Sequence, residues 1–304
     1  MILETIGWRS AILALVVSLL RSGNQVSLKF ALTALSPFWT AFARMIVSAA
    51  AVGVWGRLKS IRLALRPEEW RPMAILTFLL LVQIGLLHYG ADLSSPAYAV
   101  VLMNSNPIWA NFIAHFLVPE DRLSGPRVAG LALAFGGICV VFLGRPDPSL
   151  APSPAVGNAL VLAAAVAAAV RTVYTQRLVQ WIEPSRTVFW QTTLSLPFFL
   201  LGTVFESDRH REPLSWVPVA GVLYQGLAVG AVGLILWAYL LRKHSPGALS
   251  VFSFSIPIFG ILLSAWLLSE HLTPRLFFGA AAVLTGIYLA SRTAPAADEG
   301  QLTE

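Results

Sequence analysis

The sequence carries little charge. Only 12% of its 304 residues are Asp, Glu, Lys or Arg, whereas soluble domains carry about 25%. A water-soluble globule of this size could not cover its surface with so few charged side chains, and neither a disordered chain nor a coiled coil fits this composition. Because 57% of the residues are apolar and the mean hydropathy is +0.72, the composition predicts an all-α protein that crosses a membrane many times.

Cysteine is nearly absent as well, since Cys139 is the only one. A single cysteine excludes an internal disulfide and a cysteine metal cluster. The chain also lacks a P-loop, a nucleophile elbow and an H-E-x-x-H zinc motif. We therefore expect no enzymatic activity, no metal and no cofactor, and transport without ATP hydrolysis by this chain.

Apolar runs separated by short charged or proline-rich breaks predict ten spanning helices. Each run is close to the ~20 residues that cross a bilayer. They are expected near 9–28, 38–56, 72–91, 97–118, 126–144, 156–180, 185–205, 216–241, 247–268 and 274–291. The first run could also be the core of a signal peptide. Glu4 before it, Arg21 after it and the lack of a small-x-small cleavage site favour a span instead.

The basic residues of the breaks are unevenly distributed. If the N-terminus is cytoplasmic, most of them fall on the cytoplasmic side, five in the 57–71 break alone. This bias predicts that both termini are cytoplasmic, which requires an even number of spans. It also explains the net charge of +6, so no nucleic-acid partner is expected. We predict a multi-pass protein of the bacterial inner membrane, functional as a monomer in the lipid bilayer, with a disordered cytoplasmic tail at 293–304.

One spacing pattern occurs twice in the chain. At an offset of 150 residues the matching pairs are Ser95-Pro96 with Ser245-Pro246, Pro107 with Pro257, Glu120 with Glu270, Tyr89 with Tyr239 and Gly136 with Gly286. Near the start of each half the offset is 147, and the pairs are Asn24 with Arg171, Ser27 with Tyr174, Pro37 with Pro184 and Arg44 with Gln191. Identical gaps in such a series indicate an internal duplication.

The duplication divides the chain into a first five-helix repeat at 1–148 and a second at 149–292. An odd number of spans reverses direction, so the second repeat must enter the membrane with the opposite topology. Two inverted repeats are typical of transporters that bind substrate near the midplane between the repeats and work by alternating access. A duplicated scaffold without transport is the alternative.

The residues that carry a family resemblance are Asn24, Lys29, Pro37, Arg44, Pro107, residues 120–123, Gly130 and Gly137 in the first half, and Pro257, Glu270, Gly279, Gly286 and Arg292 in the second. In both halves the chain resembles the EamA-type unit of the drug/metabolite transporter superfamily. The resemblance covers about 9–292 and is nearest to the aromatic amino-acid exporters. It implies a ten-helix transporter, usually an inner-membrane exporter of amino acids or other metabolites. Gln191 departs from the pattern, because the first half has Arg44 there, so the halves are not expected to be equivalent.

Three arginines lie within predicted spans: Arg21, Arg44 and Arg171. An arginine at mid-helix costs ~2.5–3.5 kcal/mol on insertion scales, so it usually faces a cavity or a partner. Arg171 is the one favoured to attract a substrate carboxylate. For all three, the alternative is that the side chain reaches the interface or bonds to helix ends. No Asp or Glu lies well inside a span, which argues against proton or sodium coupling through a carboxylate.

Polar and aromatic side chains at depth complete the expected site, although each could instead pack or bond to a neighbouring helix. The expected substrate-binding residues are Asn24, Gln83, His88, Tyr89, Asn104, Trp109, Arg171, Tyr174, Trp237 and Tyr239. Pro107 and Pro257 are expected about halfway along the fourth and ninth spans. We predict that they are hinges, because a proline removes one helix hydrogen bond.

An aromatic wall with a few cationic or amide groups would suit an amphoteric solute with an apolar side chain. We therefore predict an exporter of small organic metabolites, in particular aromatic and other hydrophobic amino acids. Without a carboxylate for coupling, passive export is preferred over proton antiport. The alternative is an anion exchanger for phosphorylated metabolites or nucleotide sugars, which would need two or more basic side chains converging at the midplane.

Overall fold

The computed structural model of the protein describes residues 7–106, 108–109, 113, 125–144, 146–206, 213–244, 249 and 251–292. Within these ranges the chain is almost entirely helical and has no strand. Many helices begin at a proline, as α3, α5, α8, α9 and α14 do. Proline suits this first position, because its missing N–H would have no partner there and its φ angle is already helical.

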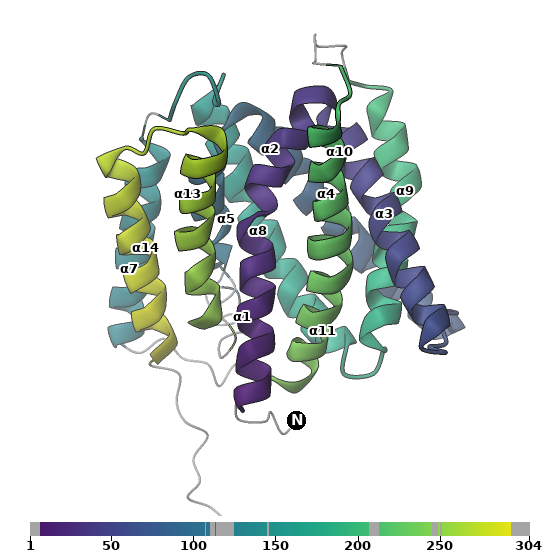
Figure 1. Cartoon of the computed structure of the whole chain (residues 1–304). Helices are drawn as coiled ribbons and strands as arrows, with labels where there is room; N and C mark the ends of the chain where they lie inside the picture. Colours follow the sequence, from purple (N-terminus) through teal and green to yellow (C-terminus); the bar gives the residue numbers. More distant parts are fainter. Residues whose placement is uncertain are drawn as a thin grey trace, which may run out of the picture.

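The first repeat consists of five helical segments (Figure 1). They are α1 (Trp8–Ser22) with α2 (Asn24–Ala34), α3 (Pro37–Leu58), the single turn η1 (Pro67–Glu69) with α4 (Trp70–Leu93), α5 (Pro96–Met103) and α7 (Gly125–Phe142). Gly23 lies between α1 and α2 and belongs to neither helix. The two helices together form the first span, which ends at Ala34, six residues beyond the predicted end.

The second repeat has the same order of segments. They are α8 (Pro154–Leu178), α9 (Pro184–Thr203), α10 (Trp216–Leu223) with η2 (Tyr224–Gly233) and α11 (Leu234–Lys243), η3 (Val251–Phe254) with α13 (Ser255–Leu268), and α14 (Pro274–Arg292). The segment η2 is a π-helix of ten residues in the middle of the eighth span. Its counterpart α4 is a regular α-helix.

Five helical stretches are long and apolar enough to cross a membrane: 8–34, 37–58, 67–93, 154–178 and 216–243. Shorter apolar helices cover 128–142, 255–268 and 274–289. Large apolar side chains cover the outside of the bundle, where Trp266, Phe278 and Phe78 are among the most exposed. Such an apolar exterior fits lipid as the surrounding solvent.

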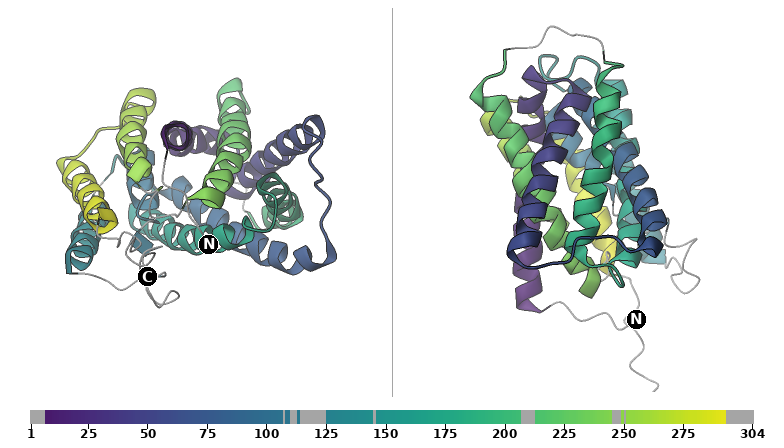
Figure 2. Two further views of the ribbon diagram at one scale, coloured as in Figure 1. Left: turned by 90° about the horizontal axis from the view of Figure 1, so that it is seen from below. Right: turned by 90° about the vertical axis from the view of Figure 1, so that its right-hand side faces the viewer.

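The packing follows the internal symmetry. In Figures 1 and 2, α7 and α14 lie side by side at one end of the elongated bundle, and α3 and α9 lie at the other. Each of these pairs joins matching helices of the two repeats. The contact of α4 with α8 likewise has its counterpart in α10 with α2, and that of α5 with α8 in α13 with α1. Over the described residues the protein therefore has the predicted all-helical fold of two repeats with five helical segments each, and five of its helical stretches are long and apolar enough to cross a membrane.

Helix α1 begins and α14 ends at the same end of the bundle, the lower end in Figure 1. We call this the near end and the opposite one the far end. Both described termini therefore lie on one side, as an even number of spans requires. That the near end faces the cytoplasm remains a prediction from the loop charges.

Glycines let α7 and α14 approach closely. A Cβ atom added at Gly137 would lie 2.7 Å from both Gly279 O and Val283 N, so the two backbones touch there. The neighbouring Gly136 faces open space and would meet nothing within 4 Å. Small residues at such a seam allow the dispersion contacts that hold helices together in lipid.

The structure corrects the expected position of one proline and leaves others outside its description. Pro257 does not lie halfway along a continuous helix, because it is the third residue of α13 and follows the 3₁₀ turn η3. In the first turn of a helix proline costs no hydrogen bond. Pro107, Glu120 and the tail at 293–304 lie outside the described residues. The hinge role of Pro257 stays a prediction.

Candidate functional site

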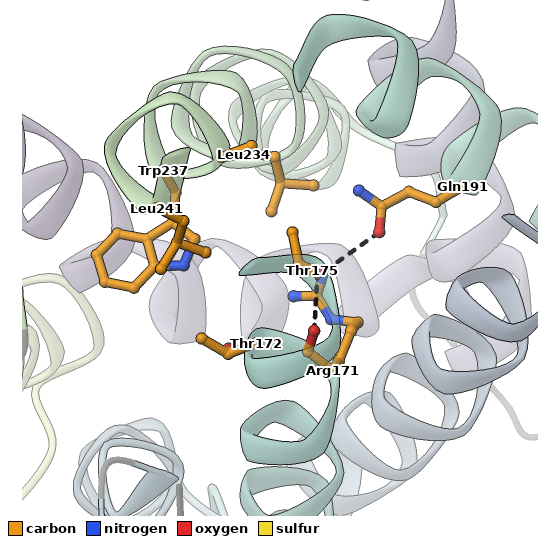
Figure 3. Close-up of a pocket in the computed structure, with 8 residues that line it drawn as sticks. Arg171, Thr172, Thr175, Gln191, Leu234, Trp237 and Leu241 are labelled. Atoms are coloured by element: carbon orange, nitrogen blue, oxygen red, sulfur yellow. Dashed lines mark hydrogen bonds between the residues drawn. The ribbon is translucent and has the colours of Figure 1, made fainter. Parts of the chain in front are cut away.

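A pocket opens between α8, α9 and α11 (Figure 3). Leu234, Trp237 and Leu241 of α11 face Arg171 of α8, and Gln191 of α9 lies on another side. The remaining lining residues are Thr172, Thr175 and Ala238. We call this the Arg171 pocket. It combines one cation, an amide and two hydroxyls with an apolar and aromatic wall.

Two glutamines hold the Arg171 side chain. Its Nε donates to Gln83 Oε1 at 2.5 Å, and its Nη1 donates to Gln191 Oε1 at 3.2 Å. The arginine is 8% exposed and both glutamines are buried. Gln83 lies 13 residues after the start of α4, about 20 Å along the helix axis and therefore near the midplane. A neutral amide positions the guanidinium without cancelling its charge.

The Arg171 pocket is narrow in this conformation. Its empty space is about 260 Å³, a volume that includes the part open to solvent, and the enclosed part has room for about one water molecule. The pocket extends from Arg171 towards Thr175 and Leu241, near the ends of α8 and α11, so it lies in the near half of the bundle. A larger solute needs a wider state.

Two further arginines lie within electrostatic range of Arg171, namely Arg21 and Arg44. The Arg21 guanidinium lies 4.5 Å from the centre of the Trp237 ring, a cation–π contact on the wall of the pocket. Within the described ranges, none of the three arginines forms an ion pair with a carboxylate. Because like charges repel, an anionic group bound beside Arg171 would be stabilised by all three.

Arg44 has an amide partner of its own. Its Nη1 donates to Gln225 Oε1 of η2 at 3.2 Å, and the side chain is 4% exposed. Gly226 permits this approach, because a Cβ atom there would lie 3.0 Å from Arg44 O and closer still to Val47. The elements η2 and α3 are therefore in direct contact at this level.

Three of the predicted site residues come together, namely Gln83, Arg171 and Trp237. Two others are buried with an unused polar atom. Asn24 Oδ1 and His88 Nε2 each lack a hydrogen-bond partner, while His88 Nδ1 bonds to Ile84 O at 2.9 Å. Since a carbonyl can only accept, Nδ1 carries the proton of that bond.

Other predicted residues are bonded away from the Arg171 pocket. Asn104 Nδ2 donates to Val100 O at 2.7 Å, and Trp109 Nε1 donates to Ser105 Oγ at 3.1 Å. The structure therefore does not bring either side chain to the lining of this pocket.

The three predicted tyrosines also lie elsewhere. Tyr89 packs edge-on against Phe38 with ring centroids 5.2 Å apart, and the Tyr174 hydroxyl donates to Pro72 O at 3.5 Å. Tyr239 is 42% exposed on the outside of α11, where Lys243 lies over its ring. The sequence match of Tyr89 with Tyr239 therefore does not place the two side chains in one pocket.

Sequence reasoning missed several residues of the site. Gln191, Thr172 and Thr175 line the Arg171 pocket, and Gln225 bonds to Arg44. The available signal was a single amide in a long apolar run, which applies to Gln225 in 216–241 as much as to Gln83. The threonines gave no such signal, because threonine is common in spanning helices.

Hydrogen bonds to helix ends connect neighbouring helices at the far end of the bundle. Lys29 Nζ donates to three carbonyl oxygens at the C-terminal end of α4, at 3.0, 3.1 and 3.2 Å. The Glu270 carboxylate accepts from Ala97 N in the first turn of α5 at 3.2 Å, and Glu206 accepts from Phe38 N at the start of α3 at 2.8 Å. A cation at a helix C-terminus and anions at N-termini complement the helix dipoles. Lys29, one of the residues that carry the family resemblance, thus has a structural role at this helix end.

Two segments of the chain, residues 8–143 and 155–292, each match the sequence profile of the EamA-like transporter family. A probable amino-acid metabolite efflux pump of Escherichia coli is 24% identical over 218 residues, 68% of this chain and 71% of the relative. An uncharacterized transporter of Archaeoglobus fulgidus is 29% identical over 211 residues, again 68% and 71%. The uncharacterized transporter YoaV of Bacillus subtilis is 21% identical over 275 residues, 90% and 93%.

A solved crystal structure has the same fold. It superposes with a TM-score of 0.69 at 16% sequence identity and covers 94% of this chain and 99% of the other. At this identity the likeness concerns the fold alone. Two matched segments, one in each half of the chain, agree with the duplication seen in the sequence.

Proposed function

Because the chain belongs to the EamA-like transporter family, we propose that it exports small organic metabolites that carry a carboxylate and an apolar side chain, foremost aromatic and other hydrophobic amino acids. One observation carries this proposal. Arg171, positioned by two neutral glutamines, faces a wall of Trp237 and two leucines. A cation beside an aromatic wall matches a solute whose charged and apolar parts are a few ångströms apart.

Export is the direction that the relatives support. The Escherichia coli and Salmonella typhimurium relatives bear the name probable amino-acid metabolite efflux pump. The loop charges predict that the near end faces the cytoplasm, and the Arg171 pocket would then receive substrate from that side. The far-end bonds of Lys29 and Glu270 would then have to break for release.

The bilayer gives the arginines their importance. A guanidinium held near the midplane loses most of its hydration, and the absence of a neutralising carboxylate among the described residues leaves it ready for an anion. The substrate carboxylate would offset part of the repulsion between Arg171, Arg21 and Arg44 while it is bound. Binding would therefore be strongest for solutes with at least one negative group.

A second candidate is favoured by the same three arginines. An exchanger of phosphorylated metabolites or nucleotide sugars needs several basic groups close together, and Arg21 and Arg44 both lie within electrostatic range of Arg171. Against it, two of them already donate to glutamine oxygens, and the wall of the Arg171 pocket is apolar. The amino-acid proposal accounts for both features.

The test is uptake of labelled phenylalanine into proteoliposomes of the purified chain, with and without an imposed pH gradient. We expect saturable uptake that does not require the gradient and is reduced by tryptophan and leucine but not by glucose 6-phosphate. No uptake of phenylalanine, together with exchange of glucose 6-phosphate or a nucleotide sugar, would replace the proposal with the second candidate.

A further inference from the structure

A second group of buried polar side chains lies outside the Arg171 pocket. It consists of Asn24, Arg44 and Gln225, which we call the far-side cluster. Their exposed fractions are 9%, 4% and 0%, yet Asn24 Oδ1, Arg44 Nε and Gln225 Nε2 have no hydrogen-bond partner. A buried polar atom without a partner costs ~1–3 kcal/mol, so three of them in one region call for an explanation.

Close backbone contacts bring the three elements of the far-side cluster together. Helix α2, which begins at Asn24, and helix α3 both contact η2. A Cβ atom at Gly23 would lie 2.7 Å from the Tyr224 hydroxyl, and one at Gly226 would lie 3.0 Å from Arg44 O. The start of η2 is therefore packed between the start of α2 and the part of α3 that carries Arg44.

The two arginines lie at mirrored depths. Arg44 is seven residues from the start of α3 at the far end, and Arg171 is seven residues from the end of α8 at the near end. Seven residues correspond to about 10 Å along a helix axis. Arg44 and Arg171 thus lie about equally deep, one from each side of the membrane.

The internal symmetry relates the two groups helix by helix. Arg171 matches Asn24, and Gln191 matches Arg44, at the offset of 147 residues. Gln83 and Gln225 lie on the matching spans α4 and α10–α11, although two helical turns apart in register. Each group therefore consists of one arginine and two amide side chains, which come from three helices that correspond between the repeats. The arginine is on the first helix of the second repeat, α8, but on the second helix of the first repeat, α3.

We infer that the far-side cluster is a second substrate station, which binds the carboxylate and ammonium groups of an α-amino acid on its way from the Arg171 pocket to the far side. The inference rests on the proposed function. It assigns Arg44 and Gln225 as substrate-binding residues. The arginine of the second repeat, Arg171, would bind the substrate first, and the arginine of the first repeat, Arg44, would bind it next.

The unused atoms fit this ligand chemistry. Arg44 Nε and Gln225 Nε2 are donors, which a carboxylate accepts from. Asn24 Oδ1 is an acceptor, which an ammonium donates to. A phosphate dianion would use the donors but leave the Asn24 oxygen facing a second negative group. The far-side cluster therefore favours a zwitterion over a phosphorylated solute.

The experiment measures KM separately from each side of the membrane. Right-side-out and inside-out vesicles are prepared from cells that express the full chain, and initial uptake of labelled phenylalanine is followed in both. Arg44→Gln gives the first repeat the glutamine that the second repeat has at the matching position, Gln191. Arg171→Asn gives the second repeat the asparagine that the first repeat has at the matching position, Asn24. Thr77→Val removes a buried hydroxyl that has no partner and belongs to neither group, so it serves as the control.

We expect Arg44→Gln to raise KM from the far side about tenfold or more, with less than a threefold change from the near side. Arg171→Asn should show the opposite pattern, and Thr77→Val should change neither value. Equal changes from both sides in Arg44→Gln, or no change at all, would overturn the second station. If the wild-type chain moves phenylalanine from neither side, the proposed function itself fails, and that outcome is distinct.

Two further variants keep the test decisive if Arg44→Gln does not accumulate in the membrane. Gln225→Leu removes one donor, and Arg44→Lys keeps the charge but loses Nε; both should raise the far-side KM selectively. Asn24→Leu should weaken the far-side preference for phenylalanine over 3-phenylpropionate, which lacks the ammonium group. An unchanged preference in Asn24→Leu would contradict the role of Asn24.

Discussion

The seam between α7 and α14 and the polar centre of the bundle follow opposite rules. At the seam, glycine backbones touch and the contacts are between small apolar groups. At the centre, Arg44, Asn24 and Gln225 keep polar atoms without partners. A protein that needed only stability would fill such gaps, so the difference separates the part of the molecule that holds the repeats together from the part that binds a solute.

The largest expected effect lies at the seam. Gly137→Leu forces a side chain against the backbone of α14, where Gly279 O and Val283 N would lie 2.7 Å from its Cβ. Overpacking of this kind costs on the order of 3 kcal/mol. We expect a large loss of folded protein, measured as the thermal midpoint in detergent by size-exclusion chromatography.

Gly136→Leu is the matched control, because its Cβ meets nothing within 4 Å. It should fold like the wild type, since its side chain adds to the lipid-facing surface. Equal thermal midpoints of Gly136→Leu and Gly137→Leu would show that the close contact of α7 with α14 does not stabilise the fold.

The second-largest effect is expected on transport, from a substitution in the polar centre of the bundle that should leave the protein folded. Arg171→Gln removes the cation of the Arg171 pocket, and we expect kcat/KM for phenylalanine to fall about 100-fold, the upper range for a lost hydrogen bond to a charged group. Arg177→Gln, on the exposed side of the same helix, is the control and should keep its transport rate. A comparable loss in both variants would show a general effect on α8.

A substitution at Gln83 separates the charge of Arg171 from its position. Gln83→Glu keeps an acceptor for Arg171 Nε but supplies a negative charge that competes with the substrate carboxylate. We expect a folded protein whose KM for phenylalanine rises about tenfold. If Gln83→Glu transports phenylalanine as well as the wild type, the charge of Arg171 does not bind substrate.

The smallest effect distinguishes two aromatic residues of α11 that are two positions apart. Trp237→Leu removes the ring that contacts Arg21, and we expect KM to rise about threefold, within the range of a cation–π contact. Tyr239→Leu changes a side chain on the outer surface and should leave KM unaltered. The measurement is the KM for phenylalanine of the two variants in proteoliposomes. A larger increase in KM for Tyr239→Leu than for Trp237→Leu would contradict the assignment of Trp237, rather than Tyr239, to the wall of the Arg171 pocket.

The sequence predicted the ten spans, the duplication and three residues that meet at the Arg171 pocket, because hydropathy, spacing and rare polar residues are all visible in one chain. It could not predict which face of each helix points inward. Helices that are apolar all round have no polar side to set their orientation. The prediction that Tyr239 shares a site with Tyr89 depended on an unbroken α-helical phase. The wide turns of η2 precede Tyr239 and shift that phase.

Pairing between arginines and glutamines was also beyond the sequence. Arg44 and Gln225 are separated by 181 residues, and only the inverted packing of the repeats brings α3 against η2. The sequence did contain the key asymmetry, since Gln191 stands where the first repeat has Arg44. Its meaning follows from the structure, in which Gln191 accepts a hydrogen bond from Arg171 of its own repeat.

The most direct test of the central claim is binding of labelled phenylalanine to the purified chain, with two competitors that each lack one charged group. Midplane arginines without carboxylate partners predict that 3-phenylpropionate, which keeps the carboxylate, competes more strongly than phenethylamine, which keeps only the ammonium. The difference should disappear in Arg171→Gln combined with Arg44→Gln. Stronger competition by phenethylamine in the wild type would contradict the account.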